Sequence, residues 1–260
     1  MSFNIKTFSC ITTSIGTFVK NGRLLILLIL LTNCQPKEKH LEKTTFSPSL
    51  VEGRYNVAFL ITDGVFNTEL TAPWDIFQHT IYRDSIKAMN VFSVSNQHTA
   101  VHTFEGLRIL PDYNFLEDSL PRIDILVVPS AEHHLDSDLE DQQLINWVRE
   151  TGQKAMFVTS HCDGAFILAQ AGLLDHVAST TFPGDIDKYI DRFPQLDIRS
   201  GVNFVHDGKY ITSAGGARSF DGALYLCELL YGKKIAQRLA QGLVITWDLE
   251  QVKKVIINER

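Results

Sequence analysis

The stretch KAMFVTSHCDGAFILAQAGLL, residues 154–174, decides the fold of the larger part of this chain. Its first half is an almost continuous apolar run, which is typical of a strand buried on both faces of a parallel sheet. A helical pattern begins at Gly164 and ends at Gly172, a residue typical of helix C-termini. Cys162 lies between the two elements. The segment therefore predicts a strand, a sharp turn that carries a cysteine, and a helix.

The same alternation extends in both directions along the chain. Apolar or β-rich runs at 55–62, 89–95 and 123–129 predict three more strands, and helical patterns follow the first and the last of them. Residues 102–115 and 202–213 predict hairpins, the second with an Asp-Gly turn, and two helical patterns at 220–230 and 235–243 close the chain. This order favours an α/β fold with three layers: a doubly wound, mostly parallel sheet with helices on both faces.

The N-terminal region has a different composition. The run LLILLILL, Leu24 to Leu31, is too short to span a hydrocarbon core, which needs about 20 apolar residues, and it is typical of the apolar part of a signal peptide. The Leu-Thr-Asn-Cys sequence that follows resembles a bacterial lipoprotein box. We therefore expect a lipoprotein signal peptide at 1–33, a lipidated Cys34, a flexible tether at 34–53 and an α/β domain at 54–260. The alternatives are an uncleaved anchor or a simple signal peptide.

These features predict a location and exclude some partners. A lipidated Cys34 would hold the protein on a membrane of the bacterial cell envelope. The net charge is −6, and no cluster of Lys and Arg occurs in the folded part, so we expect no nucleic-acid partner. Two cysteines remain beside Cys10 of the leader and Cys34, and no CxxC pair is present, so we expect no metal and no cofactor. Of these two, Cys227 lies on an apolar helix face and is predicted to be a core thiol.

Two interpretations of Cys162 follow from its position. A cysteine at a helix N-terminus is stabilised as a thiolate, and its pKa can fall from about 8.5 to roughly 3.5–7.5. A packed structural cysteine at the same bend would be inert. The carboxyl ends of parallel strands form one edge of the sheet, and Asp63, Ser130 and Cys162 each follow a predicted strand. We therefore expect these three residues to converge there.

Four segments resemble the ThiJ/PfpI superfamily in sequence, order and spacing over 55–243. They are DGVFNTELTAPWDIF, IDILVVPS, CDGAFILAQAGLLD and ITSAGGARSFDGALYLCELLYG. This superfamily is related to the class I glutamine amidotransferases and includes deglycases, cofactor-independent glyoxalases, PfpI-type proteases and isonitrile hydratases. The resemblance implies a flavodoxin-like fold, Cys162 as the nucleophile, Glu69 as the acid that hydrogen-bonds the thiolate, and commonly a homodimer. A carboxyl group beside a thiolate must be protonated, so Glu69 would act as a proton donor. Alternatively, Glu69 is an ordinary acidic residue of a helix first turn.

The chain departs from the superfamily's pattern at three positions. Thr181 stands where many members have the histidine that pairs with the cysteine. Ser130 and Ala131 replace a Gly-Gly pair, although the backbone N–H groups of Ser130 and Asp163 could still stabilise an oxyanion. Asp163 itself adds negative charge near the sulfur and opposes thiolate formation.

Other polar residues are candidates for the wall of the pocket. His161 precedes the cysteine, but neighbours at such a turn point apart, so a wall or structural role is favoured over direct pairing. His133 and His134 lie at the carboxyl end of a predicted strand, where they would reach over the pocket or be solvated. Together with Glu132 they could ligate a metal, although the spacing is poor evidence. Asp63 completes this set of pocket residues.

The function that these patterns favour is an enzyme acting on a small electrophile. The substrate would be a dicarbonyl or aldehyde, or an isonitrile, and the reaction that of a hydratase, lyase or deglycase. A carboxylate and a cysteine without a histidine disfavour a protease. The alternative is an inactive ligand-binding module, or a redox sensor in which peroxide oxidises Cys162.

Overall fold

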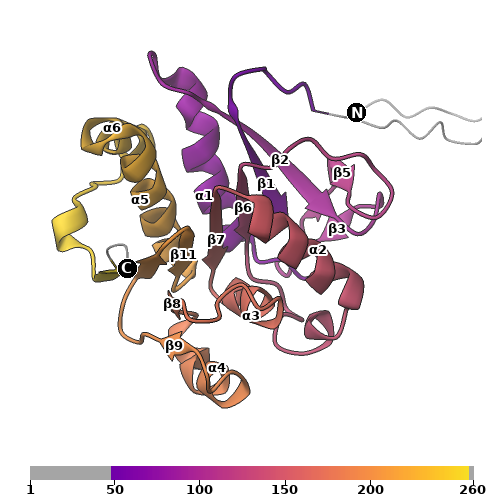
Figure 1. The fold of residues 1–260 in the computed structure, drawn as a ribbon. Coiled ribbons are helices and arrows are strands. Elements are labelled where there is room, and N and C mark those ends of the chain that lie inside the picture. The colour runs from indigo at the N-terminus through magenta and orange to yellow at the C-terminus, as the bar shows by residue number, and fades with distance from the viewer. Residues whose placement is uncertain (1–47, 258–260) are drawn as a thin grey trace, which may run out of the picture. The chain divides into compact units, whose positions relative to one another are not determined.

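The computed structural model describes residues 48–257, and a sheet of eight strands forms its centre (Figure 1). Its strands are β1 (Tyr55–Leu60), β2 (Met89–Ser95), β5 (Tyr113–Asn114), β6 (Ile125–Val128), β7 (Phe157–His161), β10 (Phe204–Asp207), β11 (Tyr210–Ser213) and β12 (Lys254–Ile257). The strand order is β12-β10-β11-β7-β6-β1-β2-β5. Every neighbouring pair is parallel except β10 and β11. The predicted mostly parallel sheet is therefore confirmed.

Six α-helices complete the described part of the chain. They are α1 (Asn67–Gln78), α2 (Gln142–Lys154), α3 (Gly164–Gln170), α4 (Ile186–Arg192), α5 (Ser219–Tyr231) and α6 (Lys233–Gly242). Short 3-10 helices are η1 (His79–Tyr82), η2 (Ser137–Leu139), η3 (Pro183–Asp185), η4 (Gly216–Arg218) and η5 (Leu249–Gln251). Two small sheets pair β3 (Val101–His102) with β4 (Arg108–Ile109), and β8 (Ala178–Ser179) with β9 (Asp197–Ile198).

The helices cover both faces of the sheet, and each face has its own core. Helices α1, α5 and α6 pack in one hydrophobic cluster, and α2, α3 and α4 pack in another on the opposite face (Figure 1). Strand β6 shows why: Ile125 and Val127 belong to the first cluster, and Leu126 and Val128 belong to the second. Successive side chains of a strand point to opposite faces, so a strand buried on both must be apolar throughout. The predicted three-layer architecture is confirmed.

Two parts of the chain differ from the sequence prediction. The chain was expected to close with two helices, but β12 follows them and pairs in parallel with β10 at the sheet edge. Residues 185–199, for which no helix or strand was predicted, contain α4 and β9. Both errors concern short elements. Strand β12 has four residues, all half-buried, and α4 has seven residues, which is too few to display a clear hydrophobic period. The hairpins β3–β4 and β10–β11 are present as predicted.

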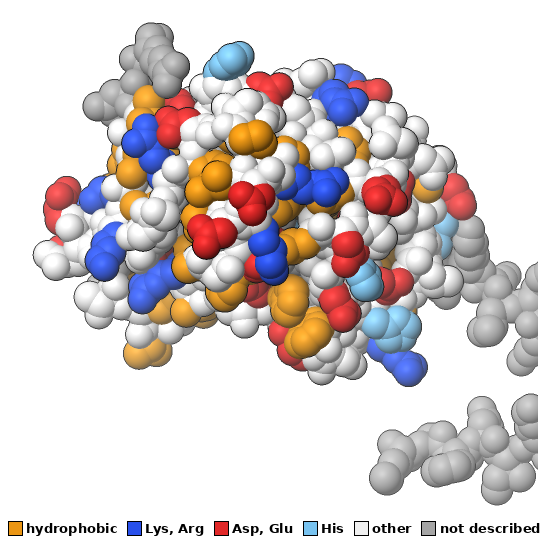
Figure 2. Space-filling model, turned by 90° about the horizontal axis from the view of Figure 1, so that it is seen from below, with side chains coloured by type: hydrophobic (Ala, Val, Ile, Leu, Met, Phe, Trp, Pro, Cys, Tyr) orange, Lys and Arg blue, Asp and Glu red, His pale blue; other side chains and the backbone are white. Residues whose placement is uncertain are grey.

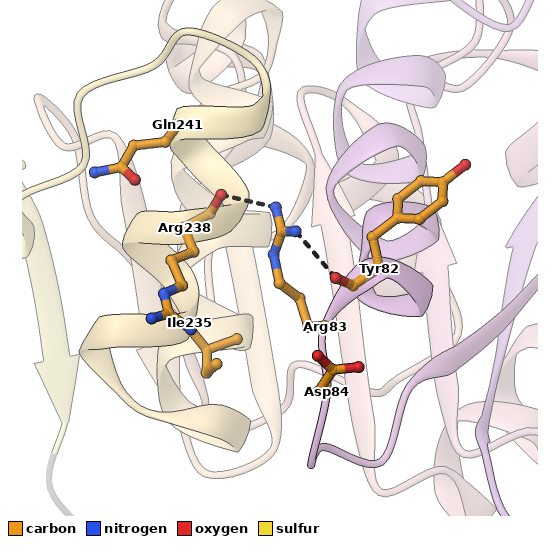
Figure 3. Close-up of a pocket in the computed structure, with 6 residues that line it drawn as sticks. All are labelled: Tyr82, Arg83, Asp84, Ile235, Arg238 and Gln241. Carbon is orange, nitrogen blue, oxygen red and sulfur yellow. Dashed lines mark hydrogen bonds between the residues drawn. The ribbon is translucent and has the colours of Figure 1, made fainter.

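Arg83 joins the two helical segments that flank the first core. Its guanidinium group donates to the carbonyl oxygens of Arg238 in α6, at 2.9 Å, and of Tyr82 in η1, at 3.2 Å (Figure 3). A hollow of about 330 Å³ lies beside this contact, and Asp84 and Gln241 also line it. None of the predicted site residues lines this hollow, so the contact is structural.

The predictions for the N-terminal region concern residues outside the described range of 48–257. The apolar run at 24–31, Cys34 and most of the tether at 34–53 precede residue 48, and the first strand begins at Tyr55. Within 48–257, no helix has the length and apolar character that crossing a membrane requires.

Candidate functional site

Cys162 occupies the sharp turn between β7 and α3. It is one of few described non-glycine residues with a positive φ, 55°, and its N–H donates to the carbonyl oxygen of Ser213 in the neighbouring strand at 3.0 Å. A left-handed conformation at a residue with a Cβ costs of order 1–3 kcal/mol and persists where surrounding structure holds it. Strain of this kind is characteristic of a nucleophile elbow. The predicted turn is thus present, with the cysteine at its strained position.

Two glycines make room for this turn. A Cβ on Gly164 would lie 2.1 Å from the carbonyl oxygen of Val128 in β6, so the first turn of α3 can approach that strand only with glycine here. A Cβ on Gly215, whose φ is 78°, would lie 2.3 Å from the Cβ of Cys162. The Gly-Gly pair after β11 therefore forms one wall of the site. This pair lies in the motif ITSAGGARSFDGALYLCELLYG, and no role for it was predicted.

Glu69 is buried in α1, and its partner is a backbone group. Its Oε1 atom accepts a hydrogen bond of 2.8 Å from the N–H of Gly216. Its charge is close enough to raise the pKa of the Cys162 thiol. Among the described residues, however, no hydrogen bond joins Glu69 to the sulfur, so the predicted direct bond is absent from this structure. The N–H of Gly216 holds one carboxyl oxygen beside Cys162.

The environment of the Cys162 thiol disfavours its anion. The residue is 7% exposed, and burial raises the pKa of the thiol, followed in effect by the charges of Asp163 and Glu69. Two groups act in the opposite sense: the Ser130 hydroxyl and the backbone N–H of Asp163. The structure therefore gives no support to the interpretation in which the helix N-terminus lowers this pKa. Desolvation of the thiolate outweighs the lowering effects of the Ser130 hydroxyl and the Asp163 N–H.

Beside the sulfur lie the backbone N–H of Asp163, as predicted, and the hydroxyl of Ser130 in place of its predicted backbone N–H. Ser130 follows β6 and is fully buried; its hydroxyl faces the thiol of Cys162 and has no hydrogen-bond partner of regular geometry. Its carbonyl oxygen accepts from the N–H of Phe66, just before α1, and so ties the loop after β1 to the end of β6. A buried polar group without a partner needs an explanation in any protein. Here it is a donor available to a ligand or a reaction intermediate.

Asp163 binds the residue that stands in place of histidine. Its Oδ1 accepts from the hydroxyl of Thr181 at 2.9 Å, and the same hydroxyl lies 3.1 Å from the carbonyl oxygen of Cys162. Its Oδ2 lies 3.7 Å from the sulfur of Cys162. Burial raises the pKa of Asp163 to about 6, Thr181 opposes this, and the nearby Asp185 adds to it. This bond between Thr181 and Asp163 was not predicted, because the sequence indicates only that Thr181 replaces a histidine.

The predicted pocket histidines do not reach the cysteine. His161 is the last residue of β7 and is buried, and its Nδ1 lies 2.8 Å from the hydroxyl of Ser213. His134 is also buried: its Nδ1 accepts from the N–H of Ala131, and Thr62 lies on its other side. Burial lowers the pKa of both rings to about 3, so both are neutral. This geometry agrees with the structural role that was favoured for His161. It does not agree with a solvated His134, because that side chain is buried.

The remaining pocket candidates face solvent. His133 is half exposed and lies 3.4 Å from Asp136, and the exposed Asp63 accepts from the N–H of His102 in β3. Glu132, His133 and His134 do not converge, and within 48–257 no group of three or more metal-ligating residues does. Viewed from the side on which α3 and α4 lie, the surface mixes acidic, basic and apolar side chains without a continuous basic patch (Figure 2).

Fold and site together define a class: a doubly wound α/β protein with a cysteine on a strained strand-to-helix turn. The chain belongs to the DJ-1/PfpI family, whose model matches residues 55–229. It is 30% identical to an isonitrile hydratase from Pseudomonas putida over 182 residues, 70% of this chain and 74% of that protein. It is 24% identical to the protein dj-1beta of Drosophila melanogaster over 59% of this chain and 80% of that protein. The crystal structure of a ThiJ/PfpI family protein from Pseudomonas syringae superposes with a TM-score of 0.65 at 22% identity, over 77% of this chain and 82% of that one.

Proposed function

We propose that this chain is a cofactor-independent hydratase of the DJ-1/PfpI family in which Cys162 adds covalently to a small electrophile, in the first place an isonitrile. The observation that carries the proposal is the left-handed Cys162 between β7 and α3, faced by the free hydroxyl of Ser130 and the N–H of Asp163. The similarity to an isonitrile hydratase over 70% of the chain supports this choice of substrate.

The chemistry needs a nucleophile and a way to move protons. The sulfur of Cys162 adds to the terminal carbon of the isonitrile, and the thiol proton ends on that carbon, which gives a thioimidate. Water then adds to the same carbon. The carbon–sulfur bond breaks, the thiol recovers a proton, and an N-substituted formamide leaves. The sum is one isonitrile plus one water, so no oxidant or cofactor is consumed.

Burial of the thiol supports a compact substrate. Cys162 is 7% exposed, so a bulky peptide could reach it only after a large rearrangement. The reactive carbon of an isonitrile is at the tip of a linear group. The reactive carbonyl group of an aldehyde or dicarbonyl is also small. Aldehydes and dicarbonyls therefore remain the next substrates to test, as hemithioacetal formers at the same sulfur.

A second function is favoured by the raised pKa of Cys162. A thiol that stays protonated fits a ligand-binding module without turnover, whereas a redox sensor needs an accessible thiolate and is disfavoured.

The deciding experiment incubates the full chain, purified in detergent, with cyclohexyl isonitrile and with methylglyoxal, and follows product by NMR. We expect catalytic formation of the formamide. Saturable binding of either compound without product would instead support the binding module.

Glu69 gives the first mutational test of this mechanism. The change Glu69→Gln keeps an oxygen that can accept from Gly216, so the free energy of unfolding should change by less than about 1 kcal/mol. The variant lacks the carboxyl group that the family resemblance makes a proton donor, so turnover should fall about 100-fold or more. Urea unfolding and the rate of formamide formation measure the two effects. Unchanged turnover in Glu69→Gln would show that Glu69 only braces Gly216.

We also propose that the protein is held at the membrane surface of a bacterial envelope through lipid on Cys34, which rests on the sequence pattern alone. In cells, the wild-type chain should sediment with membranes and incorporate labelled palmitate, and Cys34→Ala should lose the label. Label that persists in Cys34→Ala would contradict the proposal. The homodimer that the resemblance implies stays a prediction.

A further inference from the structure

The carboxylate of Asp163 is oriented toward the nucleophile. Asp163 occupies the N-cap position of α3, where an aspartate commonly accepts from helix N–H groups, but its side chain makes no such bond. Instead, Oδ1 accepts from Thr181 at 2.9 Å and Oδ2 lies 3.7 Å from the sulfur of Cys162. The side chain thus makes no capping hydrogen bond to the helix. One of its oxygens is held by the Thr181 hydroxyl, and the other points toward the thiol of Cys162.

We propose that Asp163 is the base that takes the proton of the Cys162 thiol as the sulfur attacks, and that it does the work of the histidine this chain lacks. The proposal rests on the proposed function, in which the sulfur is the nucleophile. The sulfur–hydrogen bond breaks as the carbon–sulfur bond forms, and the proton moves to Oδ2 of Asp163. The same carboxyl group then returns the proton to the substrate carbon, so no net proton is consumed.

A concerted transfer fits the electrostatics of the site. Burial raises the pKa of the thiol, so a free thiolate is scarce at neutral pH, and a base that removes the proton during attack avoids forming one. Burial and Asp185 raise the pKa of Asp163 to about 6, which places a base near the working pH. The charged groups that act on this pair are Glu69 from α1, Asp185 before α4 and, from α4 itself, Lys188, which interacts with Asp163. Both carboxylates strengthen the proton affinity of the site.

Asp185 also offers a route to solvent. Its carboxyl group contacts that of Asp163 closely enough to raise the pKa of Asp163, and its own Oδ1 lies 2.6 Å from Nζ of Lys188. Lys188 is 66% exposed and Asp185 is 16% exposed. These side chains form a path from the buried sulfur to water, in the order Cys162, Asp163, Asp185 and Lys188. Along this path Asp163 can exchange protons with solvent between turnovers.

Alkylation of Cys162 by iodoacetamide tests the base without any substrate. An unassisted buried thiol would react at a rate that rises tenfold per pH unit across pH 5 to 9, because only the scarce thiolate reacts. With Asp163 as the base, the wild-type rate should level off above an inflection near pH 6. In Asp163→Asn, this plateau should disappear and the rate should climb with pH, and turnover should fall about 100-fold or more. The matched control Asp187→Asn removes an exposed acid of α4, two residues from Asp185, and should change neither the pH profile nor turnover.

Thr181→Val is the second variant, and it keeps Asp163 in place. The Thr181 hydroxyl lowers the pKa of Asp163, so its loss should move the inflection to higher pH. A wild-type profile without an inflection, or an Asp163→Asn profile and turnover like those of wild type, would overturn the proposal. An inflection that depends on Asp163 in a protein that turns over neither isonitrile nor dicarbonyl would instead leave the base in place and reject the proposed function.

Discussion

Replacing Cys162 by serine is expected to reduce turnover of an isonitrile by about a thousandfold or more, because loss of a covalent nucleophile removes the step on which the rest of the mechanism acts. Serine has almost the same size, so the strained turn and its hydrogen bond to Ser213 should be kept. The hydroxyl is a far weaker acid than the thiol, and Asp163 cannot compensate for this difference. Initial rates of formamide formation at saturating substrate measure the effect.

Cys227 supplies the matched control for this variant. It is fully buried in α5 and packs in the core formed with α1 and α6, on the face opposite α3. Cys227→Ala should leave turnover within about twofold of wild type and cost about 1 kcal/mol of stability for the small cavity. A Cys162→Ser protein that keeps more than a tenth of the wild-type rate would mean that another group carries the chemistry.

The second large effect is on stability. Gly164→Ala is expected to lower the free energy of unfolding by at least about 3 kcal/mol, because the new Cβ would lie 2.1 Å from the carbonyl oxygen of Val128 and 3.1 Å from that of Pro129. These are backbone atoms of a central strand and the residue after it, so neither can move aside cheaply. Urea unfolding followed by circular dichroism measures the change. The strand-to-helix turn should distort along with the global loss of stability.

The control is the same substitution at another helical glycine. At the end of α6, a Cβ on Gly242 would lie 3.4 Å from the end of the Arg83 side chain and 4.0 Å from Nδ1 of His79, and both side chains can shift. Alanine is also the better helix former, by about 1 kcal/mol, so Gly242→Ala should be neutral or slightly stabilising. Similar losses in both variants would show that tight packing of α3 on β6 is not what Gly164 provides.

Much of the fold was predictable because its signals are local. The continuous apolar strands and the Asp-Gly turn each depend on a few neighbouring residues, so the layers, the parallel sheet and the turn at Cys162 followed from the pattern. Helix α4 and strand β12 were missed because four to seven residues do not display a period. Their positions are decided by packing against distant parts of the chain.

The site was predictable in position but not in its contacts. Ser130 and Cys162 could be placed at one sheet edge because both follow parallel strands. The bond from Gly216 to Glu69 joins residues 147 positions apart, and the contact between Asp163 and Thr181 crosses the segment after α3. Neither leaves a mark in a local pattern. The direction of the pKa shift of Cys162 was missed for a related reason: burial decides it, and burial depends on the whole fold.

The central claim is that the sulfur of Cys162 forms a covalent bond with the substrate. Quenching the full chain in acid during turnover of cyclohexyl isonitrile, then mapping its peptides by mass spectrometry, tests this claim most directly. The predicted result is a mass increase of one isonitrile on the peptide that contains Cys162, present in wild type and absent in Cys162→Ser. Product formation with an unmodified Cys162 peptide, or with the added mass on another residue, would contradict it.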